Sequence, residues 1–184
     1  MAENILLRRP RVTMPAVSII GMAGSGKTTT GKALSSLLGW AFMDTDHLIE
    51  ATYGARLQDI TDALPREQFL DLERSVIITL RASRCVVSTG GSSVYRPESM
   101  EHLHALGPVI CLDAPFSVIR DRIARNPDRG LVIAGGQTLR DLYEERKILY
   151  NRYADIHCDA TMTPSQCALW IQEHLPAECL ATER

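Results

Sequence analysis

The stretch AVSIIGMAGSGKT, residues 16–28, decides the fold class of this chain. Its first five residues are mostly apolar and β-branched, which is typical of a short buried strand. The next eight match G-x-x-x-x-G-K-S/T, the pattern of a phosphate-binding loop that joins a strand to a helix. The glycines let successive backbone N–H groups converge on phosphate oxygens, and the start of the helix adds a positive dipole end. The stretch therefore predicts that the chain binds a nucleoside triphosphate.

The side chains of this loop also suit contacts with MgATP. We expect Lys27 to reach the β- and γ-phosphates and to act in catalysis, and the Thr28 hydroxyl to ligate Mg²⁺. An ordinary glycine turn before a helix is the alternative, and a complete pattern between a strand and a long helical stretch disfavours it. The loop residues expected to hold the nucleotide are Gly21, Ala23, Gly24, Ser25, Gly26, Lys27, Thr28 and Thr29.

The composition is that of an ordinary globular protein. Of the 184 residues, 45% are hydrophobic and 23% are charged, which suits a single domain with a substantial core. The net charge of −2 provides no basic field of the kind that attracts nucleic acid or an anionic membrane. We therefore expect a small molecule as the partner, and neither nucleic acid nor a membrane.

Cysteine usage and the N-terminal residues bear on the cellular compartment. The five cysteines show no C-x-x-C pairing, and an odd count without a framework favours a reducing compartment. Residues 1–14 contain no apolar run long enough for a signal peptide or a membrane span. We expect these residues to be a flexible extension, with Met14 as an alternative start, and we expect the protein to be cytoplasmic.

Strand-like and helix-like segments alternate along the whole chain, with no internal repeat or linker. Such alternation predicts one α/β domain whose parallel sheet is covered by helices on both faces, giving three layers. The expected strands are residues 16–20, 40–43, 84–88, 108–112 and 155–159. The expected helices are residues 28–38, 45–53, 57–64, 65–82, 97–105, 114–125, 138–153 and 164–174.

Ligands of parallel sheets bind beyond the carboxyl ends of the strands, where Asp44 and Asp46 follow one strand. Residues two apart in an extended segment face the same way, so one carboxylate could hold Mg²⁺ while the other accepts a hydroxyl proton. The alternative is that either aspartate caps the following helix. Asp113 follows an apolar strand and is a second candidate for the metal.

Further candidates lie at the next strand end and in the second half of the chain. Thr89-Gly90-Gly91-Ser92 would allow a ligand to approach the backbone closely, although glycine pairs mostly mark turns. Arg122 and Arg129 lie on either side of the start of a Gly- and Pro-bearing segment, and Arg146 lies within a strong helix. An exposed arginine is usually solvated surface, so none of the three indicates a site by itself.

From about Val17 to Thr163 the sequence resembles the shikimate kinases, which are small cytoplasmic phosphate-loop kinases. The D-x-D pair of that family falls on Asp44 and Asp46, and its glycine triplet on residues 90–92. Its lid motif falls on Arg129-Gly130-Leu131 and its E-R…L-Y helix on Glu145-Arg146…Leu149-Tyr150. The resemblance implies a five-stranded sheet of order 2-3-1-4-5, a lid at about residues 124–136, a kinase domain over residues 15–184 and a monomer.

The resemblance also implies roles for these residues in an ATP- and Mg²⁺-dependent transfer to an alcohol group. Asp44 would belong to the metal site, and Asp46 would hold the substrate hydroxyls as the base. Arg122 would pack on adenine, Arg129 would move over the phosphates as a catalytic group, and Arg146 would grip a substrate carboxylate. The residues expected to bind the substrate are Asp46, Leu70, Gly90, Gly91, Ser92 and Arg146.

Three positions depart from the pattern of the family. Leu70 stands in Phe69-Leu70-Asp71-Leu72-Glu73 where the family has a second arginine for the carboxylate, Ser92 replaces the third glycine, and Gly130 replaces the lid proline. Losing one charged hydrogen bond should cost about 1.5–3 kcal/mol. Because the lost arginine would also have repelled an ammonium group, we hypothesise a hydroxylated amino acid such as homoserine as the acceptor.

Other functions stay open at this point. Shikimate itself is the first alternative, with Arg66 or Arg74 replacing the missing arginine. A kinase of the gluconate or nucleoside-phosphate type is another, although a nucleotide acceptor would need more arginines than the site offers. A regulatory nucleotide-binding module without catalysis is the last, and the presence of Lys27, Asp46 and Arg129 weighs against it.

Overall fold

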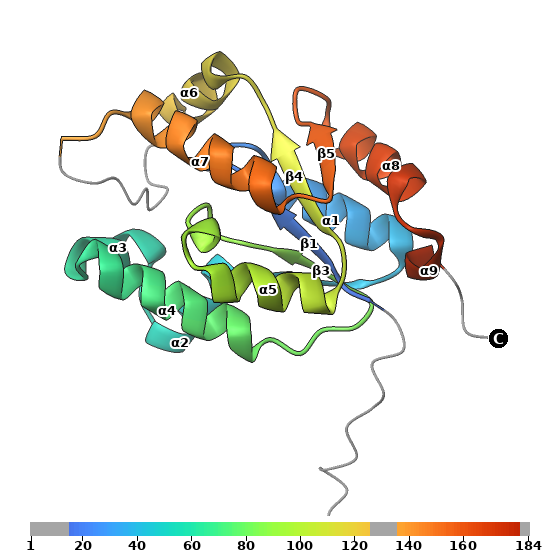
Figure 1. Cartoon of the computed structure of the whole chain (residues 1–184), viewed down its shortest axis with the longest axis horizontal. Coiled ribbons are helices and arrows are strands. Elements are labelled where there is room, and N and C mark those ends of the chain that lie inside the picture. Colours follow the sequence, from blue (N-terminus) through green and yellow to red (C-terminus); the bar gives the residue numbers. More distant parts are fainter. Residues whose placement is uncertain (1–14, 126–135, 181–184) are drawn as a thin grey trace, which may run out of the picture.

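A computed structural model describes residues 15–125 and 136–180 of the chain (Figure 1). Five parallel strands form one sheet in the order β2-β3-β1-β4-β5, so the predicted fold class and strand order are confirmed. The strands are β1 (Val17–Ile20), β2 (Ala41–Asp44), β3 (Cys85–Ser88), β4 (Val109–Asp113) and β5 (Ile156–Asp159).

The burial of the strands follows their place in the sheet. Strands β1 and β3 are buried at every residue, as expected for inner strands of a sheet that helices cover on both faces. Their register pairs Ile19 with Ser88, while β1 pairs Ile19 with Ile110 of β4 on its other side. The edge strands β2 and β5 keep exposed residues. The phosphate-binding loop therefore leaves the sheet from its most central strand.

The helices lie in two layers about this sheet (Figure 1). Helix α1 (Lys27–Leu38) packs against α8 (Pro164–His174) on one face, and both contact the sheet. Helices α5 (Pro97–Leu106) and α7 (Leu139–Tyr153) lie over the other face. The other helices of the described residues are α2 (Thr45–Tyr53), α3 (Leu57–Ala63), α4 (Arg66–Thr79), α6 (Phe116–Ala124), α9 (Ala177–Leu180) and the short 3₁₀ helix η2 (Ser93–Tyr95).

The helix boundaries agree with the sequence to within one residue, except that α6 begins two residues later than predicted and α4 ends three residues earlier. The sequence predicts a helix over residues 65–82, whereas α4 begins after Pro65 and ends at Thr79. Leu80 leaves helical geometry with φ −57° and ψ 140° and is buried with Ala82 and Val87 in a small separate cluster. We infer that burying these apolar side chains stabilises the fold more than one further turn of helix would. The short elements η2 and α9 are not predicted by the sequence.

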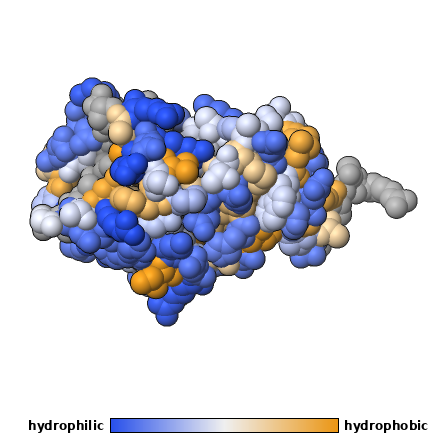
Figure 2. Space-filling model, turned by 90° about the horizontal axis from the view of Figure 1, so that it is seen from above, coloured by the Kyte–Doolittle hydropathy of each residue, from blue (hydrophilic) through white to orange (hydrophobic). Residues whose placement is uncertain are grey.

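The surface offers no broad apolar face in the view of Figure 2. Hydrophilic residues predominate there, and hydrophobic residues form small separate patches. Within the described part of the chain, every helix is too short or too polar to cross a membrane.

Candidate active site

A cavity of about 740 Å³ lies beyond the carboxyl ends of β1, β2 and β3. The phosphate-binding loop forms one end of it, and residues from α2, α3, α4 and α7 form the other. Predicted site residues in its lining are Ala23, Gly24, Ser25, Gly26, Lys27, Thr28, Thr29, Asp46, Gly90, Gly91, Ser92, Arg122 and Arg146. The structure therefore brings together in one place residues that lie as far as 123 positions apart in sequence, from Ala23 to Arg146.

The lysine of the loop between β1 and α1 is hydrogen-bonded to the backbone of the same loop. Lys27 Nζ donates hydrogen bonds to the carbonyl oxygens of Gly21 and Met22 at 2.9 and 3.1 Å. Burial lowers the pKa of Lys27, and the carboxylates of Asp46 and Asp44 oppose that shift. Gly26 precedes α1 with a φ of 98°, a backbone conformation that a side chain would strain. The loop thus carries a buried cation and free N–H groups at a helix start, as phosphate oxygens require.

Asp44 connects the loop to the second strand. Thr28 Oγ1 donates a hydrogen bond to Asp44 Oδ2 at 2.8 Å, and Asp46 N donates to Asp44 Oδ1 at 3.1 Å. Asp44 therefore caps α2, which is one of the two interpretations that the sequence left open, and it also lies beside the Thr28 hydroxyl.

This pair of oxygen ligands fits Mg²⁺, which takes one or two protein oxygens and completes its shell with water and phosphate. Thr28 and Asp44 are the residues that would hold it. The other candidate for the metal, Asp113, ends β4 and lines a separate small pocket, whereas Asp44 is hydrogen-bonded to Thr28 of the phosphate-binding loop. Among the described residues no group of three or more His, Cys, Asp and Glu forms a larger metal site.

Arg122 fixes the far side of the nucleotide end. Its Nη1 donates to the carbonyl oxygens of Gly24 and Ser25 at 3.3 and 3.4 Å, and its Nη2 donates to Ala160 O at 2.9 Å. The side chain thereby joins α6 to the phosphate-binding loop and to the turn after β5. The lining near it includes Ala160, Met162 and Pro164, which are apolar neighbours suited to the flat face of a base.

Two carboxylates meet at the other end of the cavity, on either side of Gly90. A Cβ atom at Gly90 would lie 2.0 Å from Glu73 Oε1 and 2.7 Å from Asp46 Oδ1. Burial and Asp44 raise the pKa of Asp46 to about 6, against the charge of Lys27. Burial and Asp46 raise the pKa of Glu73 to about 7. Asp46 is thus a carboxylate poised near neutrality, as a general base for a hydroxyl requires.

Glu73 is not among the residues predicted to form the site. Its hydrogen-bond partner is Ser92, one of the positions that depart from the family pattern. Glu73 is 1% exposed, and Ser92 Oγ donates a hydrogen bond to its Oε2 at 2.7 Å. This bond lowers the pKa of Glu73 and partly offsets its burial. In the sequence, Glu73 is the last residue of the stretch 69–73. The apolar residues of this stretch predict a buried helical face, and nothing in their periodicity indicates a buried carboxylate.

Arg146 is enclosed between α7 and the chain after β3. It is 2% exposed, and its Nε donates to Tyr95 Oη at 3.4 Å. A Cβ atom at Gly91 would lie 2.9 Å from Arg146 Nη1, so a side chain there would displace the guanidinium. Tyr150 donates a hydrogen bond to Gly91 O at 2.7 Å and holds that backbone in place. A buried cation that lines a polar cavity is well suited to a carboxylate ligand.

Two of the predicted site residues are placed differently or lie outside the described range. Leu70 is 1% exposed and is not in the cavity lining, where Phe69 of the same helix is found instead. The structure therefore buries Leu70 outside the cavity in which we expect the substrate. Arg129 and most of the expected lid, residues 126–135, lie outside the described residues.

Comparisons with known proteins agree with this geometry. The family described as shikimate kinase matches residues 23–176. A shikimate kinase of Sulfurihydrogenibium sp. (strain YO3AOP1) is 36% identical over 155 residues, 83% of this chain and 93% of the relative. That of Gloeobacter violaceus is 36% identical over 154 residues, 82% and 86% of the two chains. The solved structure of shikimate kinase from Acinetobacter baumannii in complex with shikimate is 30% identical with a TM-score of 0.79, covering 88% and 92%.

Proposed function

This chain belongs to the shikimate kinase family, so it is an ATP- and Mg²⁺-dependent kinase of small molecules, and we propose that its acceptor is shikimate. The observation that carries the proposal is the buried Arg146 in the cavity wall, together with a relative of 30% identity whose structure contains shikimate. A carboxylate bound by Arg146 would leave the hydroxyl groups of the ring to reach Asp46.

The proposed mechanism is an in-line transfer of the γ-phosphoryl group to one of these hydroxyls. Asp46 would accept the hydroxyl proton as the acceptor attacks, since its pKa of about 6 leaves it mostly ionised at neutral pH. Lys27 would leave the carbonyl oxygens of Gly21 and Met22 to bind the phosphates and stabilise the charge that develops on them. Mg²⁺ held by Thr28 and Asp44 supplies further charge neutralisation when it is bound.

The structure weakens the argument for an amino acid as the acceptor. That argument depends on a loss of positive charge at position 70, which would make room for an ammonium group. Leu70 does not reach the cavity, and a second guanidinium, that of Arg66, lies on the same tyrosine ring as Arg146. Arg66 lies outside the cavity lining, but its place on this ring puts a second cation beside Arg146, and an ammonium group would be repelled there.

Acceptor-dependent release of ADP from MgATP tests the proposal. We expect purified protein to release ADP with shikimate, and to do so far more slowly with homoserine or without an acceptor. Turnover with homoserine and none with shikimate would contradict the proposal and restore the amino-acid hypothesis. Absence of stimulation by both acceptors would favour a different small hydroxy acid or a nucleotide-binding module.

A further inference from the structure

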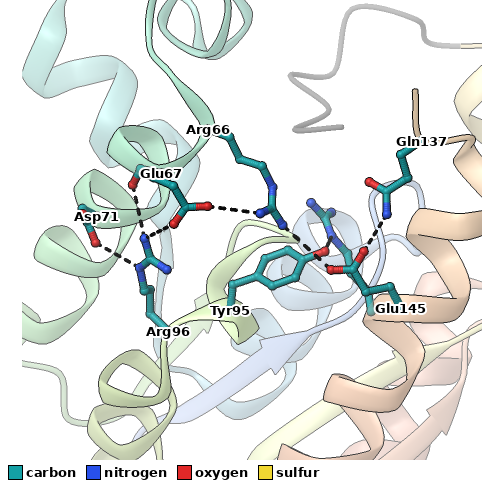
Figure 3. Close-up of polar contacts among 8 residues, drawn as sticks. Arg66, Glu67, Asp71, Tyr95, Arg96, Gln137 and Glu145 are labelled. Carbon is teal, nitrogen blue, oxygen red and sulfur yellow. Dashed lines mark hydrogen bonds and ion pairs between the residues drawn. The ribbon is translucent and has the colours of Figure 1, made fainter. Parts of the chain in front are cut away.

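Two guanidinium groups lie against the ring of Tyr95, and Figure 3 labels this ring and one of the two arginines, Arg66. The Cζ atom of Arg66 is 4.6 Å from the ring centroid, and the Cζ atom of Arg146 is 5.4 Å from it. Tyr95 Oη also accepts the hydrogen bond from Arg146 Nε. Two like charges on one ring repel each other, so the arrangement stores an electrostatic cost that a bound anion would remove.

The helix α4 brings Arg66 to this place. Arg66 is the first residue of α4 and lies four residues before Leu70, so the two side chains share one face of the helix. Helical side chains also lean toward the N-terminus, which carries Arg66 away from the core that encloses Leu70. Figure 3 shows Arg66 extending from α4 toward Glu145 of α7, with Tyr95 between the two helices.

The present partners of Arg66 are weak. Its Nη1 lies 3.2 Å from Glu67 Oε1 and its Nη2 lies 3.9 Å from Glu145 Oε1, and both glutamate side chains are largely exposed, at 64% and 43%. Its Nε is buried and has no hydrogen-bond partner within residues 15–125 and 136–180. Exposed ion pairs of this kind contribute little, whereas a charged hydrogen bond to a buried anion contributes more.

Three neighbouring arginines form ion pairs with carboxylates of their own. Arg96 is held by Glu67 and Asp71 at 2.8 and 3.0 Å, as Figure 3 shows. Arg74 of the same helix α4 pairs with Asp71 at 3.8 Å. Arg56 lines the cavity and donates from its Nε and Nη2 to Asp59 in an ion pair that is itself exposed, so Arg56 is a second candidate that the test below includes.

We propose that Arg66 is a specificity-determining residue, which with Arg146 binds the carboxylate of the acceptor, while Tyr95 supports both guanidinium groups. This inference rests on the proposed function, since it assigns a second cation to the same acceptor. It also explains how the chain tolerates Leu70: the cation comes from one helical turn earlier. On binding, Arg66 exchanges its loose contact with Glu145 for the acceptor carboxylate.

The test compares Arg66→Met with Arg74→Met, using shikimate and the carboxamide of shikimate as acceptors. Arg74 is a matched control because it lies on the same helix with a similarly exposed side chain, 34% against 31% for Arg66. With shikimate we expect Arg66→Met to raise KM about ten- to a hundredfold, with a smaller change in kcat. With the carboxamide, and in Arg74→Met with either acceptor, the change should stay below about fivefold.

Two further variants separate binding of the carboxylate from a structural role. Arg66→Lys keeps the charge without the planar fork and should restore part of the affinity for shikimate. Glu145→Gln removes the competing carboxylate and should lower KM for shikimate or leave it unchanged. If Arg66 served only to tie α4 to α7, Glu145→Gln would raise KM as Arg66→Met does, and that result would overturn the inference.

The possible failures are distinguishable. An active wild-type enzyme whose Arg66→Met variant keeps its KM for shikimate would overturn the inference and leave the proposed function intact. The inference would also be overturned if Arg66→Met raised KM equally for shikimate and for the carboxamide. It would likewise be overturned if Arg56→Met, and not Arg66→Met, raised KM for shikimate alone. A wild-type protein that does not phosphorylate shikimate would overturn both. An unchanged KM for ATP and an unchanged thermal midpoint in Arg66→Met would show that the variant is folded.

Discussion

The two ends of the cavity are built in different ways. The nucleotide end consists mainly of consecutive backbone groups between β1 and α1, with Lys27 and Thr28 added from the start of the helix. The end that we propose for the acceptor is assembled from single side chains of four separate elements: Asp46 of α2 and Arg146 of α7 line the cavity, and Glu73 of α4 and Tyr95 of η2 lie outside the lining. A backbone site tolerates few changes, whereas one side chain in an assembled site can be replaced by another that arrives from a different direction.

This difference accounts for where the chain departs from its family. The nucleotide end keeps every residue of the phosphate-binding pattern, whereas two of the departures lie at the acceptor end or behind it: Ser92 is in the cavity lining, and Leu70 is buried on α4 outside the lining. There the loss of an arginine at position 70 coincides with a serine that donates to Glu73 and with Arg66 beside Arg146. The following predictions would break or sharpen the comparison between the two ends.

The largest effect is expected from Asp46→Asn, because it removes the base from the acceptor end alone. We expect kcat for phosphoryl transfer to fall about 10²- to 10⁴-fold. Binding of ATP, measured by titration of the protein with nucleotide, should change by less than about fivefold, since the phosphates are held by the loop. Asp113→Asn is the control, and it should leave both quantities nearly unchanged. Equal losses of binding and transfer in Asp46→Asn would assign Asp46 to the nucleotide end.

Gly90→Ala should have the next largest effect. The added Cβ would overlap Glu73 Oε1 and approach Asp46 Oδ1, so the two carboxylates must move. We expect a loss of about 1–3 kcal/mol in the free energy of unfolding and a clear fall in kcat/KM for the acceptor. Gly39→Ala is a useful comparison: its Cβ meets nothing within 4 Å, and only its φ of 64° opposes the change. Full acceptor turnover in Gly90→Ala would show that the carboxylates need not adjoin this backbone.

A smaller and pH-dependent effect is expected from Glu73→Gln. Because the pKa of Glu73 is raised from 4.5 to about 7, the folded state binds its proton more tightly than the unfolded state does. Its contribution to stability is therefore present below pH 4.5 and is lost as the pH rises through about 7. Above pH 7 the variant should be more stable than the wild type by about 3 kcal/mol at most. Urea titrations across pH 4–8 that show the same pH dependence in both proteins would contradict this assignment.

The same contrast explains how much the sequence could predict. The fold followed from periodicity and from one contiguous motif, so the strands, their parallel arrangement and the place of Lys27 and Thr28 were accessible. Leu70 is expected at the substrate only because the family has a substrate-binding arginine at that position. The structure buries its side chain outside the cavity lining. In the sequence, Glu73 looks like part of a buried helical face and Tyr95 like part of a turn. Only the packing of η2 against both α4 and α7 gives them a role.

The acceptor can be tested most directly by competition. The protein is incubated with equal concentrations of shikimate and homoserine and limiting MgATP, and the two phosphate esters are quantified by mass spectrometry. The ratio of the products equals the ratio of the kcat/KM values, so differences in assay conditions cancel. We predict that shikimate phosphate exceeds homoserine phosphate by at least about a hundredfold, because two guanidinium groups favour a carboxylate without an ammonium group. A predominance of homoserine phosphate would contradict this account of the acceptor end.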